Sequence, residues 1–144
     1  MGLIRTYLNA GVLIAAAQSA TRLSHAALAI LEDPSREFVV SEYLRLEVLP
    51  KAYYHHSIAE VALYEEFFAS AAVAVPFDAV HFEPALKYAY QFGLSAFDAL
   101  HLTVAAMSGC EELITSEKPS SPMFRFKGLL INSIDPESSH RFLQ

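Results

Sequence analysis

Cysteine is nearly absent from this sequence, because Cys110 is the only one among 144 residues. A single cysteine excludes an internal disulfide and any cysteine-rich zinc site, so Cys110 is predicted to be a small buried apolar residue. Long apolar runs are also missing: no stretch reaches the roughly 20 residues that cross a bilayer, and residues 1–6 lack a signal-peptide pattern. We therefore expect a cytoplasmic protein that does not interact with a membrane.

Basic residues are scarce as well, with 10 Lys and Arg against 16 Asp and Glu and a net charge of −6. A broad nucleic-acid-binding surface needs clustered positive charge to displace counterions, so this balance argues against one. A local strip of Lys118, Arg125 and Lys127 could meet a phosphate backbone or could be solvated loop charge. The excess of acids also suits a site that holds a divalent cation.

Apolar residues are abundant instead, at 53% of the chain with a mean hydropathy of +0.29. This level predicts a parallel sheet buried on both faces and a sizeable subunit interface. A chain of 144 residues is large enough for one complete core. We expect one domain over residues 1–135 and a polar C-terminal tail over residues 136–144.

Short apolar strands alternate with helical patterns along the chain. Strands are predicted at residues 4–8, 37–40, 73–76, 112–115 and 128–132. Helices are predicted at residues 12–31 with a break near Ser19 or Ser24, from Ser41 through Glu47 to an end or bend at Pro50, and at 57–72, 82–92 and 95–108. This order predicts an α/β fold with a parallel sheet covered by helices on both sides.

Three helix ends have specific signals. Ser57 and Glu60 have the spacing of a capping box at the start of the helix predicted at residues 57–72. Gly93 follows the next helix, and Gly109 follows the last one, at positions where glycine can take the left-handed conformation. These residues set the boundaries of the predicted helices.

Polar residues follow several of the predicted strands. Asn9 follows the first strand, Ser41 and Glu47 follow the second, Glu117 follows the fourth, and Asp98 opens the helix before the fourth. Ligands of open α/β sheets bind beyond the carboxyl ends of the strands, so these side chains are predicted to converge. Converging carboxylates repel one another unless a cation binds or their pKa values rise. Oxygen ligands suit Mg²⁺ or Mn²⁺ better than zinc.

Each acid also has a structural interpretation. Asp98 lies on the first turn of a helix capped by Ser95, where a carboxylate complements the helix dipole. Glu47 could be a solvated helix acid, and Glu117 could be a loop charge. His101 shares a helical face with Asp98, and we interpret it as a hydrogen-bonded core histidine rather than a metal ligand.

Two further groups favour structural interpretations. The pair His55-His56 lacks a spaced third ligand, so a zinc site is not expected there. A group of aromatic residues could stack on RNA bases, but its helical spacing at 64, 67 and 68 fits core or interface packing better. The group consists of Tyr53, Tyr54, Tyr64, Phe67 and Phe68.

Four blocks occur in order along the chain: Tyr7-Leu-Asn-Ala-Gly-Val-Leu-Ile, Ser41-Glu-Tyr-Leu-Arg-Leu-Glu47, Leu94-Ser-Ala-Phe-Asp-Ala-Leu-His-Leu102 and Leu113-Ile-Thr-Ser-Glu117. Together they resemble the PIN domain family, the fold of VapC-type toxins of bacterial toxin–antitoxin pairs, over nearly the whole chain. The resemblance implies a three-layer α/β/α sandwich around a mostly parallel sheet of about five strands. It also implies a metal-dependent ribonuclease with Mg²⁺ or Mn²⁺ as cofactor and RNA as substrate.

The resemblance assigns the metal and catalytic roles to Asn9, Glu47, Asp98 and Glu117. Ser41, Thr115 and Lys118 would orient water or phosphate. A cognate antitoxin and a second copy of the chain are the implied partners. An alternative is an inactive PIN-like binding module that engages an antitoxin or another protein partner.

The family usually has Asp, Thr and then Asn or Ser where this chain has Asn9, Ala10 and Gly11. An amide brings no charge, so the nominal four carboxylates fall to three, and both metal affinity and cleavage should be weakened. The missing hydroxyl and second polar side chain would also remove support for the ligands. Glu117 replaces the usual Asp and keeps the charge on a longer arm.

Overall fold

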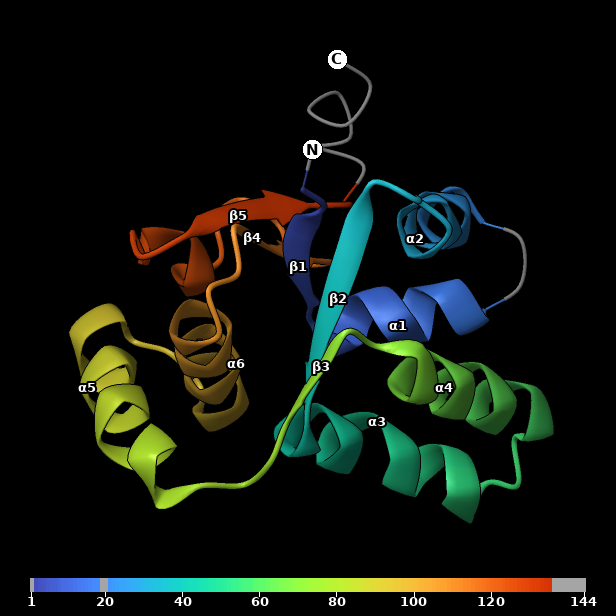
Figure 1. Ribbon diagram of the computed structural model, residues 1–144, viewed down its shortest axis with the longest axis horizontal. Coiled ribbons are helices and arrows are strands. Elements are labelled where there is room, and N and C mark those ends of the chain that lie inside the picture. The colour runs from blue at the N-terminus through green and yellow to red at the C-terminus, as the bar shows by residue number, and fades with distance from the viewer. Residues whose placement is uncertain (1, 19–20, 136–144) are drawn as a thin grey trace.

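Five parallel strands form the centre of the computed structural model, which describes residues 2–18 and 21–135 (Figure 1). The strands are β1 (Ile4–Leu8), β2 (Arg36–Ser41), β3 (Val73–Val75), β4 (Glu112–Thr115) and β5 (Leu130–Ser133). Their order across the sheet is β3-β2-β1-β4-β5, and every neighbouring pair is parallel. The predicted α/β fold with five parallel strands is confirmed.

Helices cover both faces of this sheet, as Figure 1 shows. One side carries α1 (Ala10–Ala17), α2 (Arg22–Leu31), α3 (Glu42–Tyr54) and α4 (Ile58–Ser70). The other side carries α5 (Phe82–Phe92) and α6 (Ala96–Met107). Two short 3-10 turns, η1 (Ala79–His81) and η2 (Pro122–Arg125), lie in the connections. The molecule therefore has the three layers that the sequence predicts.

The two cores follow from the alternation of side chains along each strand. Leu8, Val40 and Ile114 point toward α1–α4 and belong to one buried cluster. Their neighbours Tyr7 and Leu113 point toward α6 and belong to the other. Because both faces are covered, consecutive residues such as Tyr7 and Leu8, Val39 and Val40, and Leu113 and Ile114 are buried on opposite sides of the sheet. Each fully buried Leu or Ile stabilises the fold by roughly 1.5–3 kcal/mol.

Side-chain caps and one glycine fix the ends of the helices that carry the polar residues. Ser95 Oγ accepts a hydrogen bond from the Asp98 N–H at 3.3 Å and starts α6. Ser41 Oγ accepts from the Leu44 N–H at 3.1 Å and starts α3. Gly93 ends α5 with φ of 71°, a left-handed conformation that costs glycine little. These boundaries agree with the sequence prediction.

Helix α3 continues past Pro50 to Tyr54, so of the predicted end or bend at Pro50, the end is wrong. Proline removes one backbone hydrogen bond from the helix. Pro50 itself is exposed, whereas Leu49 and Ala52 on either side are buried in the core. Packing of these apolar neighbours therefore outweighs the local cost of proline.

The predicted capping box at Ser57 is also absent, although α4 begins where expected. The Ser57 side chain makes no capping hydrogen bond, its backbone N–H donates to the Ala52 carbonyl at 3.0 Å, and Glu60 accepts from the Tyr64 hydroxyl at 3.2 Å. A reciprocal capping box occurs in α2 between Thr21 and Ser24. The interruption predicted within residues 12–31 therefore lies before Thr21, and Ser19 lies outside the described residues.

The remaining expectations concern the ends of the chain and Cys110. Strand β5 starts at Leu130, two residues later than predicted, because its register with β4 begins where Leu130 pairs with Glu112. Cys110 is buried, and burial raises the pKa of its thiol to about 12. Within the described residues, no helix is long and apolar enough to span a bilayer. The predicted tail over residues 136–144 lies outside the described residues.

Candidate active site

The carboxyl ends of β1 and β4 hold a group of polar side chains in direct contact. The Asn9 N–H donates to the carbonyl of Ile114 at 2.9 Å, which fixes the two strand ends side by side. The side-chain nitrogen of Asn9, Nδ2, lies 3.2 Å from Thr115 Oγ1 and 3.4 Å from Glu117 Oε2. The structure therefore brings Asn9, Thr115 and Glu117 together, as the sequence predicts for this edge.

Glu117 is held from several sides. Its backbone N–H donates to Thr115 Oγ1 at 3.1 Å, and Ser121 Oγ donates to its Oε1 at 2.7 Å. Asn9 caps α1, because its Oδ1 accepts from the Ala10 N–H at 2.8 Å. This bond fixes the orientation of the amide, so that its N–H side faces Glu117. The carboxylate of Glu117 is therefore orientated before any ligand binds.

Asp98 is half-buried on the first turn of α6 and is electrostatically coupled to the other acids. Burial raises its pKa, and the charges of Glu117 and Glu47 raise it further, while His101 and the hydrogen bond from Ser95 act in the opposite direction. A carboxylate that only complemented a helix dipole would have a lowered pKa. Burial therefore outweighs the favourable position at the helix start, and the charges of Glu117 and Glu47 add to it.

Glu47 is hydrogen-bonded to a histidine: its Oε1 lies 2.6 Å from Nε2 of His101. The other ring nitrogen of His101 lies 2.6 Å from the Tyr7 hydroxyl, which lies 2.7 Å from Ser41 Oγ. We refer to Ser41, Tyr7, His101 and Glu47 as the buried polar network. The interpretation of His101 as a hydrogen-bonded core histidine is confirmed, since its side chain is 0% exposed.

The predicted contacts of Ser41 and Thr115 with water or phosphate disagree with their burial. Ser41 is 1% exposed and Thr115 is 0% exposed, and both hydroxyls already have protein partners. Both side chains therefore hydrogen-bond residues inside the protein, Tyr7 and Asn9, and neither hydroxyl faces solvent. Lys118 is exposed beside Glu117, so its role toward phosphate stays a prediction.

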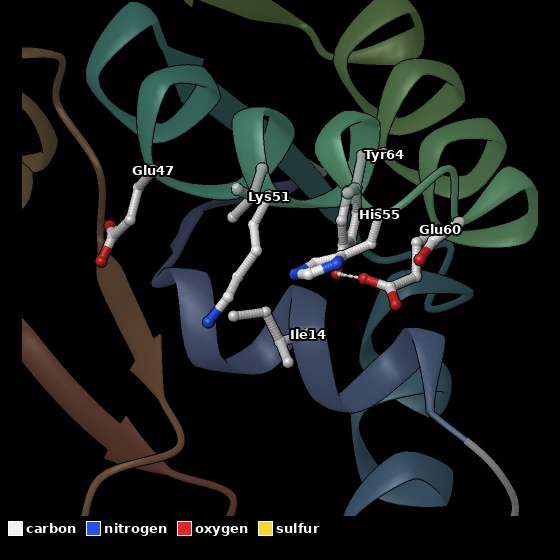
Figure 2. Close-up of a pocket in the computed structure, with 9 residues that line it drawn as sticks. Ile14, Glu47, Lys51, His55, Glu60 and Tyr64 are labelled. Atoms are coloured by element: carbon white, nitrogen blue, oxygen red, sulfur yellow. Dashed lines mark hydrogen bonds between the residues drawn. The ribbon is translucent and has the colours of Figure 1, made fainter.

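A cavity of about 210 Å³ adjoins Glu47 between α1, α3 and α4 (Figure 2). Glu47 lies at one end, Lys51 extends over the middle toward Ile14, and His55 lies at the far end. Glu60 and Tyr64 line the same end, joined by the hydrogen bond drawn as a dashed line. The cavity therefore begins at Glu47, one of the acids predicted at the carboxyl edge of the sheet, and runs along one face of α3. We call the edge with Asn9, Glu47, Asp98 and Glu117 the acidic edge.

The donor set allows a test of the predicted metal. Within residues 2–18 and 21–135, no three His, Cys, Asp or Glu side chains already converge in a metal-binding group. Glu47 is bonded to His101, and Asn9 gives its oxygen to a backbone N–H. Asp98 and Glu117 remain as two carboxylates, and burial together with repulsion from Glu117 raises the pKa of Asp98. A hard divalent cation fits this pair, since it would remove the repulsion.

Other predicted groups lie away from this edge. Among the described residues, His55 and His56 belong to no group of three potential metal ligands. Tyr64 and Phe67 are buried in the core on the α4 side, which confirms the packing interpretation. Arg125 donates to the carbonyl of Phe92 at the end of α5, and so it is tied to a helix end.

Tyr7 is the member of the site that sequence reasoning missed. The signal was available, because a tyrosine in the central strand, two residues before Asn9, must find a partner for its hydroxyl when it is buried. Burial also raises the pKa of Tyr7 well above its usual range, so the hydroxyl keeps its proton. The partner could not be identified, since His101 is 94 residues away along the chain.

A parallel α/β sheet with acids at the carboxyl ends of its strands defines the class of protein to which this chain belongs. The chain is a member of the PIN domain family, whose model matches residues 6–118. No curated protein matches the sequence. The resemblance inferred from the four sequence blocks is therefore confirmed at the level of the family.

Solved structures of toxin–antitoxin systems share the fold. A chain in the VapBC2 structure from Rickettsia felis, bound to a promoter DNA fragment, has a TM-score of 0.66 at 12% identity, covering 90% of this chain and 98% of that chain. A chain of a toxin–antitoxin complex from Klebsiella pneumoniae gives 0.64 at 18%, covering 87% and 95%. DNA-bound VapBC from Salmonella typhimurium gives 0.64 at 17%, covering 92% and 99%. At these identities the likeness is one of fold.

Proposed function

We propose that the protein is a divalent-metal-dependent ribonuclease of the PIN toxin type, with a site weakened by Asn9. The observation that carries this proposal is the convergence of Asn9 and Glu117 at the carboxyl ends of β1 and β4, where burial and the charges of Glu117 and Glu47 also raise the pKa of Asp98. Acidic groups that raise one another's pKa at a strand edge, in a fold of this family, are an arrangement suited to binding a cation. Mg²⁺ or Mn²⁺ would be held by Asp98 and Glu117, with Glu47 and Asn9 beside them.

A bound cation would neutralise non-bridging phosphate oxygens and lower the pKa of a bound water. The protein's own residues would orient the metal ligands and bind the substrate phosphate. Asn9, Thr115 and Ser121 hold Glu117 in one orientation. Lys118 is exposed next to Glu117, where it can meet a phosphate of the substrate.

Titration calorimetry with Mn²⁺ tests the metal site. Asp98→Asn should abolish detectable binding, because it removes one of the two carboxylates. Asn9→Asp should raise the affinity by about tenfold, the effect of roughly 1.4 kcal/mol. Cleavage of single-stranded or structured RNA should change in the same directions.

Glu83→Gln is the matched control, since Glu83 also lies on the first turn of a helix, α5, but is exposed and away from the site. It should bind Mn²⁺ as the unmodified protein does. Unchanged binding and cleavage in both Asp98→Asn and Asn9→Asp would contradict the nuclease proposal.

A second candidate function is an inactive PIN-like module that binds an antitoxin or another protein. The arrangement of Asn9 favours it, because the amide directs N–H groups, not oxygen, at Glu117. We also propose an antitoxin and a second copy of the chain as partners, supported by the likeness to chains of toxin–antitoxin complexes. The cytoplasmic location stays a prediction.

A further inference from the structure

We propose that Tyr7 and His101 are positioning residues, which hold Glu47 beside Asp98 and Glu117 through hydrogen bonds that all run in one direction. This inference rests on the proposed function, because it concerns the orientation of a residue at the same site. The distances are short throughout: 2.7 Å from Ser41 Oγ to Tyr7 Oη, 2.6 Å from Tyr7 Oη to His101 Nδ1, and 2.6 Å from His101 Nε2 to Glu47 Oε1.

The Glu47 end of the buried polar network sets the direction of its hydrogen bonds, and the Ser41 end is compatible with that direction. At one end, Ser41 Oγ accepts from the Leu44 N–H, which leaves its own hydroxyl proton free to donate to Tyr7. At the other end, an ionised carboxylate can only accept, so His101 donates its Nε2–H to Glu47. A neutral imidazole protonated at Nε2 then accepts at Nδ1 from the Tyr7 hydroxyl. Every hydrogen-bonding atom between the two ends has a partner.

Burial makes this arrangement informative. Tyr7 and His101 are 0% exposed, whereas the Glu47 side chain is 31% exposed. Buried polar groups cost stability unless they are satisfied, and apolar residues of similar shape can fill such space at little or no cost. Glu47 is therefore the place where the network reaches the surface and can affect a ligand.

The hydrogen bond from His101 restricts the side-chain conformations of Glu47. A glutamate side chain loses up to roughly 2 kcal/mol of conformational entropy when it is fixed. The bond from His101 fixes one carboxylate oxygen in advance and leaves the other available. Side chains that orient a metal ligand in this way typically change metal affinity by about 10- to 100-fold. They would supply support that Ala10 and Gly11 cannot provide.

The two positioning residues lie on the elements that carry the acidic edge. Tyr7 lies two residues before Asn9 at the end of β1. His101 lies three residues after Asp98, on the same face of α6. The network therefore links β1, β2, α3 and α6, which meet at this edge of the sheet.

Four variants test the inference by Mn²⁺ titration. Tyr7→Phe and His101→Leu each remove a donor from the network and should lower the affinity by about tenfold or more. His101→Gln keeps an amide donor for Glu47 and an oxygen acceptor for Tyr7, so it should restore near-normal affinity. Thr103→Val is the matched control, because Thr103 is a buried residue of the same helix whose hydroxyl bonds only the Ala99 carbonyl among the described residues.

Nuclear magnetic resonance of the metal-free protein gives a second readout. The His101 ring should carry its proton on Nε2, in slow exchange with water, and Glu47→Ala should speed up that exchange. A proton found on Nδ1 alone would overturn the inference, as would Tyr7→Phe and His101→Leu variants that bind Mn²⁺ like Thr103→Val. If the unmodified protein binds no Mn²⁺, the proposed function fails. Loss of Glu47 side-chain order in Tyr7→Phe then supports the positioning role, and unchanged order overturns it.

Discussion

The direction of the pKa shift of Asp98 differs from the one expected for an acid that only complements a helix dipole. A carboxylate at the N-terminus of a helix is normally stabilised as an anion by the free N–H groups and the dipole. Asp98 departs from this pattern, because burial and the charges of Glu117 and Glu47 outweigh these favourable contacts and raise its pKa. Its ionised form therefore lowers the stability of the folded protein when no cation is bound.

This predicts a pH-dependent effect of Asp98→Asn on stability. A folded pKa above the unfolded value of 3.8 means that ionisation of Asp98 costs stability as the pH rises through both values, and that the full cost is present at pH 7. Asp98→Asn should therefore melt a few degrees higher than the unmodified protein at pH 7, and the gain should vanish below pH 3.8. Thermal melts in a chelator measure this difference.

Glu83→Gln is again the control, because it removes a first-turn acid that is exposed. A lower melting temperature for Asp98→Asn at pH 7 would mean that the helix-dipole contribution dominates. In that case the structural interpretation of Asp98 would be correct.

At the scale of elements, α3 connects the acidic edge to the neighbouring cavity. Glu47, Lys51 and His55 are spaced four residues apart, so they lie on one face of the helix. Lys51 has no carboxylate within ion-pair distance among the described residues, since no salt bridge includes it. An RNA strand that leaves the acid site along this face would bring a phosphate to Lys51.

Lys51→Met should raise the KM for RNA by about two- to fivefold with little change in kcat, because one exposed charge contact contributes roughly 0.5–1 kcal/mol. Lys87→Met, an equivalent change of an exposed lysine on α5, should leave both constants unchanged. Steady-state cleavage assays at low salt measure the effect. Equal KM values for the two variants would place the RNA on another face.

Element boundaries were predictable wherever the signal was local. Ser95 and Gly93 act on their own helix ends, so their roles could be inferred from position alone. The helix end at Pro50 and the capping box at Ser57 were predicted wrongly. Packing of Leu49 and Ala52 carries α3 past Pro50, and the Ser57 N–H donates to the Ala52 carbonyl while Glu60 accepts from Tyr64. Propensity is a weak guide where such contacts exist.

At the scale of the whole molecule, the sequence predicted where the site lies but not how its members bond. The edge followed from strand order, and it correctly brought Asn9 and Glu117 together. The contacts of Glu47 could not be derived, because His101 is 54 residues away and reaches Glu47 only through the packing of α6 against α3. Periodicity identifies which face of a helix is buried, but not which buried polar atoms meet.

An exposed apolar surface at α3 and Phe77 is the candidate contact face for the proposed second copy of the chain. Leu46, Tyr53 and Phe77 are all exposed and line one hollow of about 330 Å³. Clustered apolar side chains at a surface are typical of interfaces. The expected homodimer would therefore bury this side of the molecule.

Leu46→Asp should shift the protein from dimer to monomer in sedimentation at micromolar concentration, since it places a charge in the proposed interface. Leu130→Asp, which changes an exposed leucine on the edge strand β5, should leave the dimer intact. A monomer before any substitution, or equal effects of both variants, would exclude this interface.

The central position of β1 affects when the protein becomes complete during translation. Asn9 leaves the ribosome early, but the strand beside it, β4, is synthesised about a hundred residues later. At roughly 5–20 residues per second, Asn9 waits on the order of 5 to 20 s for Glu117. A nascent chain therefore cannot bring Asn9 and Glu117 together until β4 and the residues that follow it have been synthesised.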